Sequence, residues 1–263
     1  MSPAIRPRIP RAVQRPLLAT ALLLGGGCAA LSLDHPASAP HPLPTVEPPS
    51  RTPRASARAD GSTLSDEQAQ AALLTQTDLG APWTATRGAA TWRDGLLKSR
   101  TSAGECQPLL DALYGDELLG APARVAVGLD DADTEAQLRF QIAGRRPADV
   151  DAALAWLGTL PVRCARFTAV TEQGLVEDVQ VVDAPLPEVG DARQGLRVTV
   201  AGTAPDDQRF LLTLDVAAVR VGEDAFALTN GGLGDVPNDA TQAAVQIGAL
   251  RLADIRRQGL AQV

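Results

Sequence analysis

The sequence predicts an α+β fold: a single antiparallel sheet packed by helices on one face, with one disulfide. Segments in which apolar and polar residues alternate follow one another through short turns, which is the pattern of successive hairpins. Stretches with a helical spacing of apolar residues lie at the start, in the middle and at the end of the same region. Because hairpins build antiparallel sheets and amphipathic helices need an apolar surface to cover, these patterns favour one helix-backed sheet.

The folded domain is expected over residues 63–263, and local patterns assign most of its elements. Ser65 with Gln68 three residues later has the pattern of a capping box and opens the first helix. Val150 and Leu154 belong to the apolar stripe of the clearest helix. The expected order is a helix at 65–74, irregular chain or a short strand at 83–98, a short helix at 108–114, a hairpin of strands at 123–129 and 135–143, a helix at 148–160, strands at 167–172, 175–182, 196–201, 209–221 and 225–229, and a helix at 239–257.

The amino-terminal segment has the parts of a secretory signal peptide. Four arginines and no acid precede an apolar stretch of about a dozen residues, which ends in small residues. This stretch is too short for a permanent membrane helix, which needs roughly 20 residues. We therefore expect residues 1–27 to be a signal peptide that is removed.

Cys28 directly follows the small residues, and this arrangement resembles the lipobox of bacterial lipoproteins. The resemblance implies that Cys28 becomes the lipidated first residue, carrying palmitate and tethering the protein to the outer face of the cell membrane. The usual leucine three residues before the cysteine is replaced by Gly25, with Leu24 one step earlier. Ordinary cleavage after 37–39 is disfavoured by Pro40, whereas cleavage just past Cys28 would leave a soluble secreted protein and stays open as an alternative.

Residues 28–62 connect the lipidated cysteine to the domain. Seven prolines lie among Ser, Ala and Arg in this segment, and no apolar periodicity is present. Such a composition predicts a disordered, partly polyproline spacer that holds a folded domain away from the bilayer.

The charge balance disfavours nucleic acid as a partner. Removal of residues 1–27 takes away four of the 24 basic residues and none of the 31 acidic ones, which leaves a net charge of −11. An acidic surface repels phosphate backbones, and no polybasic patch follows Cys28. Membrane contact is therefore expected through the lipid alone. Lys98 is the one lysine beside many arginines, and with abundant Ala, Gly and Pro this bias indicates a GC-rich bacterial genome.

Two cysteines remain for the domain once Cys28 is assigned to the lipid. Cys106 and Cys164 form an even pair, and in an oxidising compartment such a pair is expected to be one disulfide. Two buried free thiols are the alternative.

Histidine is absent from residue 61 onward, and this removes several kinds of catalysis. Ser-His-Asp triads, Cys-His nucleophiles and His-ligated zinc sites all need an imidazole. We expect neither a catalytic residue nor a cofactor, and the chain is predicted not to be an enzyme.

Three aspartates in the predicted hairpin turn are candidate metal ligands. Asp130, Asp131 and Asp133 offer oxygen atoms suited to Ca²⁺. The loop lacks the central glycine and the terminal glutamate of an EF-hand, so a solvated turn is favoured and no metal is expected.

Trp83, Trp92 and Asn230 are the candidate ligand-binding residues. The two tryptophans lie in irregular chain and could line a groove, although packing in the core is the favoured interpretation. Asn230 opens a glycine-rich stretch, 230–234, which lacks the lysine of a phosphate-binding loop and the dinucleotide spacing. This stretch is predicted to be a flexible connection into the last helix, at the rim of a groove.

Residues 73–80, Leu-Leu-Thr-Gln-Thr-Asp-Leu-Gly, lead to Trp83 and resemble the opening of the actinobacterial extracellular sensor domain found in PknH-type Ser/Thr kinases and in stand-alone lipoproteins. The positions of Cys106 and Cys164 fit the same layout, and the similarity covers about residues 64–258. It implies a helix-backed antiparallel sheet with a groove, used as a non-catalytic binding or sensing module. The kinase versions carry four cysteines in two disulfides, so one crosslink is absent here and their pairing order is not carried over. The chain has no kinase domain.

These patterns favour a membrane-tethered extracytoplasmic lipoprotein whose domain binds or senses an envelope ligand or protein of unknown identity. A carboxylate-dependent hydrolase of envelope glycans is one alternative, because paired acids perform such chemistry, but spacing along the chain selects no pair. A purely structural or interaction lipoprotein without a small ligand is the other.

Overall fold

The computed structural model describes residues 64–260. The predicted signal peptide, the lipidation site Cys28 and the proline-rich spacer lie outside these residues, so those assignments stay predictions. Among the residues that are described, no helix has the length and apolar character needed to cross a bilayer.

The secondary structure follows the expected order closely, with an additional short helix at 76–79, a π-helical turn at 93–97 and an additional short strand at 99–101. The elements are α1 (Asp66–Ala71), α2 (Gln76–Leu79), β1 (Trp83–Ala85), the π-helical turn η1 (Arg93–Leu97), β2 (Ser99–Thr101), α3 (Gln107–Gly115), β3 (Val125–Asp131), β4 (Gln137–Ala143), α4 (Pro147–Arg163), β5 (Arg166–Thr171), β6 (Val176–Asp183), β7 (Ala192–Thr203), β8 (Arg209–Val221), β9 (Asp224–Leu233) and α5 (Asp239–Leu260).

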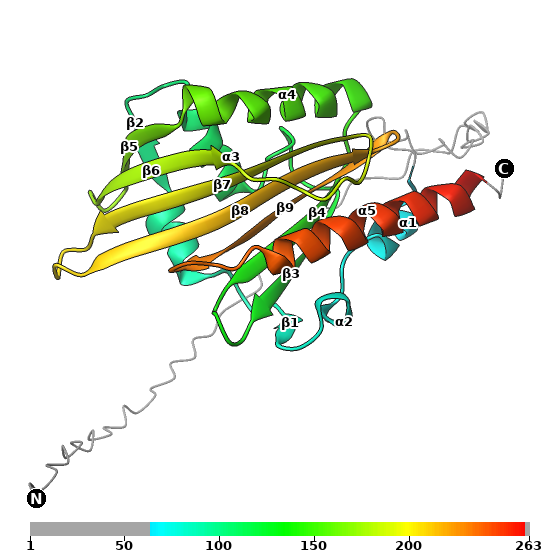
Figure 1. Cartoon of the computed structure of the whole chain (residues 1–263), viewed down its shortest axis with the longest axis horizontal. Coiled ribbons are helices and arrows are strands. Elements are labelled where there is room, and N and C mark those ends of the chain that lie inside the picture. Colours follow the sequence, from blue (N-terminus) through cyan, green and yellow to red (C-terminus); the bar gives the residue numbers. More distant parts are fainter. Residues whose placement is uncertain (1–63, 261–263) are drawn as a thin grey trace, which may run out of the picture. The chain divides into compact units, whose positions relative to one another are not determined.

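All strands of the described residues belong to one antiparallel sheet. Its nine strands run in the order β1-β3-β4-β9-β8-β7-β6-β5-β2, and every neighbouring pair is antiparallel (Figure 1). The predicted α+β class and the single antiparallel sheet are confirmed.

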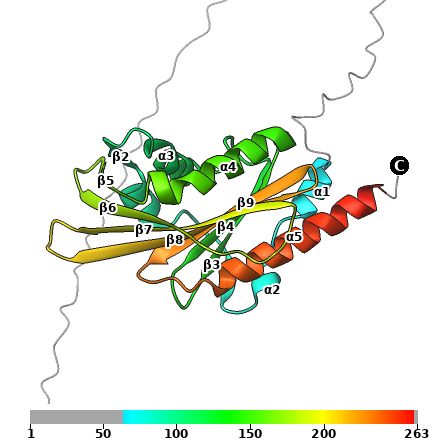
Figure 2. The same ribbon diagram turned by 45° about the horizontal axis from the view of Figure 1, so that its top comes forward.

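The prediction that helices cover one face of the sheet is wrong, because both faces carry helices (Figure 2). On β8, Leu214 and Val216 pack in the core that α3 and α4 cover, whereas Ala217 and Val219 pack in the core that α5 covers. The central strands β8 and β9 are apolar almost throughout and are buried on both sides. Among the strands of the described residues, β5 and β6 show the one-sided alternation of buried and exposed residues that the sequence suggested for the whole sheet.

The packing of α5 on the sheet depends on a close approach to two aromatic rings. Phe140 and Phe226 stack with their ring centroids 4.9 Å apart beneath the helix. A Cβ atom at Gly248 would lie 2.7 Å from the ring of Phe140, which is closer than van der Waals contact allows. Glycine at this position therefore sets how near α5 lies to β4 and β9.

The ends of several elements differ from the sequence prediction. The first helix stops at Ala71 instead of continuing to Leu74, although its capping box between Ser65 and Gln68 is present. The stretch 230–234 is mostly the end of strand β9, and not a flexible connection. A Cβ at Gly231 would lie 2.2 Å from the side chain of Leu214, so glycine serves close packing inside the sheet.

The predicted disulfide is present and joins two helices on the same face. Cys106 directly precedes α3, Cys164 directly follows α4, and both are about 1% exposed. The bond closes a loop with a sequence separation of 58 residues, so it is expected to reduce the entropy of the unfolded chain substantially.

We predict that replacing both cysteines with serine, Cys106→Ser with Cys164→Ser, lowers the free energy of unfolding by about 2–4 kcal/mol. Urea denaturation followed by tryptophan fluorescence measures this change. Wild-type protein treated with a reductant is the matched control and should approach the same midpoint. An unchanged midpoint in both samples would show that the crosslink adds no stability.

Candidate functional site

Two hollows flank the turn between β3 and β4, one on each face of the sheet. The Trp92 hollow has a volume of about 380 Å³ and the Trp83 hollow one of about 320 Å³. Asp131 and Thr134 line both of them. The Trp92 hollow is lined by Gly88, Ala89, Ala90, Thr91, Trp92, Asp130, Asp131, Thr134, Glu135, Gln137 and Leu233. The Trp83 hollow is lined by Leu79, Trp83, Asp131, Thr134, Ala136, Asn230, Val236, Pro237, Asp239, Ala240 and Ala243.

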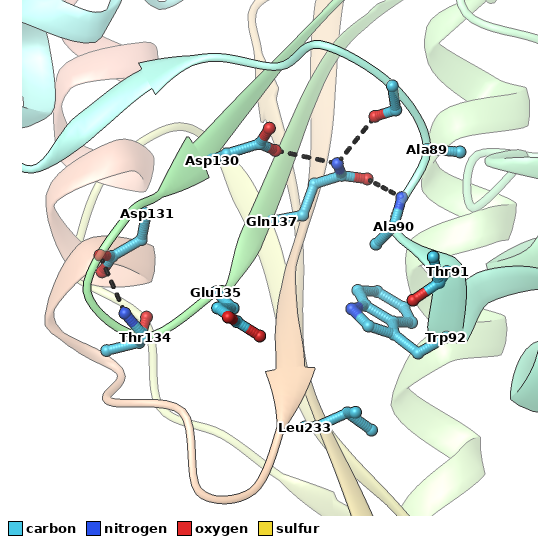
Figure 3. Close-up of a pocket in the computed structure, with 11 residues that line it drawn as sticks. Ala89, Ala90, Thr91, Trp92, Asp130, Asp131, Thr134, Glu135, Gln137 and Leu233 are labelled. Atoms are coloured by element: carbon cyan, nitrogen blue, oxygen red, sulfur yellow. Dashed lines mark hydrogen bonds between the residues drawn. The ribbon is translucent and has the colours of Figure 1, made fainter. Parts of the chain in front are cut away.

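Hydrogen bonds from the β3–β4 hairpin hold one wall of the Trp92 hollow in place (Figure 3). Gln137 Nε2 donates to Asp130 Oδ1 over 2.9 Å and to the carbonyl of Gly88 over 3.1 Å. The Thr86 hydroxyl donates to the same Asp130 oxygen over 2.7 Å, and the amide of Ala90 donates to Gln137 Oε1 over 3.4 Å. Asp130 and Gln137 therefore fix the irregular segment 86–92 against the sheet.

Trp92 projects from this segment toward the turn that carries Glu135 (Figure 3). Its side chain is largely buried, and its indole Nε1 has no hydrogen-bond partner among the described residues. Leaving a buried donor unpaired costs about 1–3 kcal/mol. Arg93 follows Trp92 and lies over the ring, 5.8 Å from its centroid, while bonding Asp116 beside α3.

A series of buried polar side chains, linked by hydrogen bonds, lies beneath the Trp83 hollow. The register of the sheet places Arg197, Asp215 and Asn230 side by side on β7, β8 and β9. Arg197 Nε donates to Asp215 Oδ1 over 2.8 Å, and this bond raises the pKa of the guanidinium. The Thr241 hydroxyl, in the first turn of α5, donates to Asp215 Oδ2 over 3.1 Å and accepts from Asn230 Nδ2 over 3.2 Å.

Asn230 is the last residue in this series of hydrogen bonds, and one of its polar atoms forms no hydrogen bond. Its side chain is 0% exposed, and Oδ1 has no partner among the described residues. Trp83, which pairs with Asp131 in the register of β1 and β3, lines the same hollow as Asn230. The residues that line the hollow thus include an indole and an amide whose oxygen is buried and unpaired.

The lining of both hollows is acidic. It includes the carboxylates of Asp130, Asp131, Glu135 and Asp239, and the described residues that line the hollows include no lysine or arginine. Such a surface attracts cations and repels phosphates and carboxylates.

The three aspartates named as candidate metal ligands have separate roles. Asp130 accepts the bonds described above, and Asp131 Oδ1 accepts from the amides of Asp133 and Thr134 within the turn. Asp133 lines neither hollow. Within residues 64–260, no three Asp, Glu, Cys or His side chains are grouped as a metal ion would need.

Two larger hollows lie elsewhere. One, of about 490 Å³, lies between α3 and α4 and is lined by Trp156, Leu118 and Arg145 among others. The other, of about 800 Å³, lies among the residues that connect β5 to β6 and β7 to β8. Neither is lined by a residue that the sequence had marked as a candidate.

The structure therefore brings together five of the sequence candidates and separates one. Trp83, Trp92, Asn230, Asp130 and Asp131 line the two hollows at the β3–β4 turn, and Asp133 lines neither. Sequence reasoning missed Thr134, Glu135, Gln137 and Asp239. Gln137 had a usable signal, since it is a polar residue at the head of an apolar strand.

No protein-family profile and no curated protein matches this sequence. Among solved structures, the chain is similar to the extracellular domain of PknH from Mycobacterium tuberculosis, with 14% sequence identity and a TM-score of 0.41. The match covers 75% of this chain and 99% of that domain. The similarity suggested by the sequence is thus found in the structure as a loose match. A likeness this loose assigns neither a ligand nor a function.

One buried carboxyl group lies outside both hollows. Glu177 on β6 is 0% exposed, and neither of its carboxylate oxygens has a hydrogen-bond partner among the described residues. Burial raises the pKa of Glu177 to about 7, and the nearby Ser99 hydroxyl acts in the opposite direction.

This pKa makes stability depend on pH. Between about pH 4.5 and 7 the folded protein keeps a proton on Glu177 that the unfolded chain has released, so stability falls as pH rises and levels off above 7.

We predict that Glu177→Gln raises the free energy of unfolding at pH 8 by about 1–3 kcal/mol and changes it little at pH 4.5. Urea denaturation across this pH range measures the difference. Asp178→Asn, on the exposed side of the same strand, is the control, and an equal pH slope in wild type and Glu177→Gln would contradict the prediction.

Proposed function

We propose that the chain is a membrane-tethered extracytoplasmic lipoprotein whose domain is a non-catalytic ligand-binding or sensing module. The ligand binds at the two hollows that flank the β3–β4 turn. The proposed extracytoplasmic location rests on the predicted signal peptide and on Cys28. The Cys106–Cys164 disulfide supports this location, because such bonds persist in oxidising compartments.

The observation that carries the binding function is the pairing of apolar walls with unused buried polar atoms. Each hollow is lined by a tryptophan and by a residue with a buried polar atom that has no partner among the described residues, Trp92 Nε1 or Asn230 Oδ1. Ligand sites of proteins likewise combine aromatic and apolar side chains with placed polar groups, in volumes from about 300 Å³ upward. A ligand that satisfied these atoms would recover the free energy that their burial costs.

The arrangement of acids favours binding over hydrolysis. A glycosidase needs one carboxyl group with a raised pKa facing a second across the substrate. Glu177 is the described carboxyl group whose pKa is raised, and it lines neither hollow. One oxygen of each nearby aspartate, Asp130 Oδ1 and Asp131 Oδ1, accepts hydrogen bonds that hold the hairpin and its turn.

The site can be tested by filling it. Thr134 is exposed and lines both hollows, so Thr134→Tyr should obstruct them without touching the core. Ala132→Tyr adds the same ring to the same exposed turn but outside the hollows, and is the matched control. We predict that the full chain purified from its native membranes carries a small molecule, detected by mass spectrometry after denaturation. Thr134→Tyr should lose it and Ala132→Tyr should keep it. Equal recovery from both variants would place the ligand elsewhere, and no recovery from wild type would favour a purely structural lipoprotein.

The tether has its own test. We predict that Cys28→Ala abolishes incorporation of labelled palmitate and moves the protein from the membrane fraction to the soluble fraction. A Ser38→Ala variant, altered in the same region, should remain labelled and membrane-bound. Equal labelling of Cys28→Ala and wild type would exclude Cys28 as the lipidation site.

A further inference from the structure

The hydrogen-bond network beneath the Trp83 hollow determines which atom of Asn230 is free. The Thr241 hydroxyl has one proton, and it donates that proton to Asp215. The hydroxyl can therefore only accept from Asn230, which orients the amide with Nδ2 toward Thr241. The carbonyl oxygen Oδ1 is left without a partner, so this position requires a hydrogen-bond donor.

The charges around the hollow point to a donor that is also cationic. Asp131 and Asp239 line it, and no described lining residue is basic. Arg197, the nearest cation of the network, is occupied by Asp215 and by the carbonyl of Val236, over 2.8 and 2.9 Å. The first turn of α5 also lies here, and its Asp239 offsets the positive end of the helix dipole.

The remaining lining favours an organic body over a bare metal ion. Asp131 and Asp239 are the acidic groups of this hollow, and the described residues hold no metal-binding group of three. The other lining residues are chiefly apolar, with Trp83, Leu79 and Val236 among them. An indole face attracts organic ammonium groups through its quadrupole, an interaction worth about 0.5–2 kcal/mol. The volume of about 320 Å³ limits the ligand to a small molecule.

We propose that the Trp83 hollow binds a small organic ammonium ion, a primary amine on a short apolar or aromatic body. The ammonium group donates to Asn230 Oδ1 and pairs with Asp131 and Asp239, and the body of the ligand lies against Trp83. This inference rests on the proposed binding function and names the chemical class of its ligand.

Three compounds with the same ring and different charge test this proposal on the full chain by isothermal titration calorimetry. They are 2-phenylethylammonium, the neutral 2-phenylethanol and the anionic 3-phenylpropanoate. The ammonium compound should bind at least about tenfold more tightly than the alcohol, and the carboxylate should not bind. Added NaCl should lower the affinity for the ammonium compound, because salt screens exposed charges.

Variants then locate the binding. Asp131→Asn and Asp239→Asn should each weaken 2-phenylethylammonium about three- to tenfold. Asp133→Asn removes the same charge from the same turn but lines neither hollow, and it should change affinity less than about twofold. Asn230→Leu should abolish binding, and because it disturbs the buried network its fold is checked by thermal unfolding. The substitutions at half-buried Asp131 and exposed Asp239 keep the test decisive if Asn230→Leu does not fold.

The outcomes separate this inference from the proposed function. Binding of 2-phenylethanol as tight as that of the ammonium, or equal loss in Asp133→Asn and Asp239→Asn, would overturn the ammonium assignment. In that case recovery of a different native ligand, lost from Thr134→Tyr, would leave the binding function standing. Failure of 2-phenylethylammonium to bind, together with recovery of no native ligand, would overturn both.

Discussion

Burial of β8 and β9 on both faces is the constraint on which the rest of the domain depends. Their apolar residues point alternately to the two sides, and exposing either set would cost about 25 cal/mol for each Å² of apolar surface. α3 and α4 must therefore cover one side and α5 the other (Figure 2). α5 covers its side of the sheet only from Asp239 onward. The Trp83 hollow lies at the first turn of this helix, beside the β3–β4 hairpin.

Burial on both faces also explains why the polar residues in these strands need specific hydrogen-bond partners. Asp215 and Asn230 are buried inside strands, so their polar atoms need hydrogen-bond partners other than bulk water. Arg197 and Thr241 supply these partners, and the chain of bonds links three strands to the first turn of α5. A network of this kind is stable only when nearly every atom is paired. The free oxygen of Asn230 is therefore informative about a ligand in a way that an exposed amide would not be.

Local sequence patterns predicted the elements well and the site only in part. The capping box at Ser65, the helix after Arg146 and the long strand at 209–221 depend on neighbours a few residues away, and all three are present. Trp83, Trp92 and Asn230 stood out by residue type and place. Thr134 and Asp239 did not, because their role depends on the strand register, which pairs Leu138 with Asn230, and on where α5 begins.

The sequence by itself determined the α+β class, the antiparallel sheet and the disulfide pairing. These follow from short-range periodicity and from the two cysteines available to the domain. It also excluded histidine-dependent catalysis in the domain, because the residue is absent there. Only the tertiary structure decided that helices cover both faces and that two acidic hollows share one hairpin turn. The apolar composition of a buried strand does not reveal whether helices cover one face or two. Side chains more than 100 residues apart, such as Asp131 and Asp239, meet only through the register of the sheet and the packing of α5.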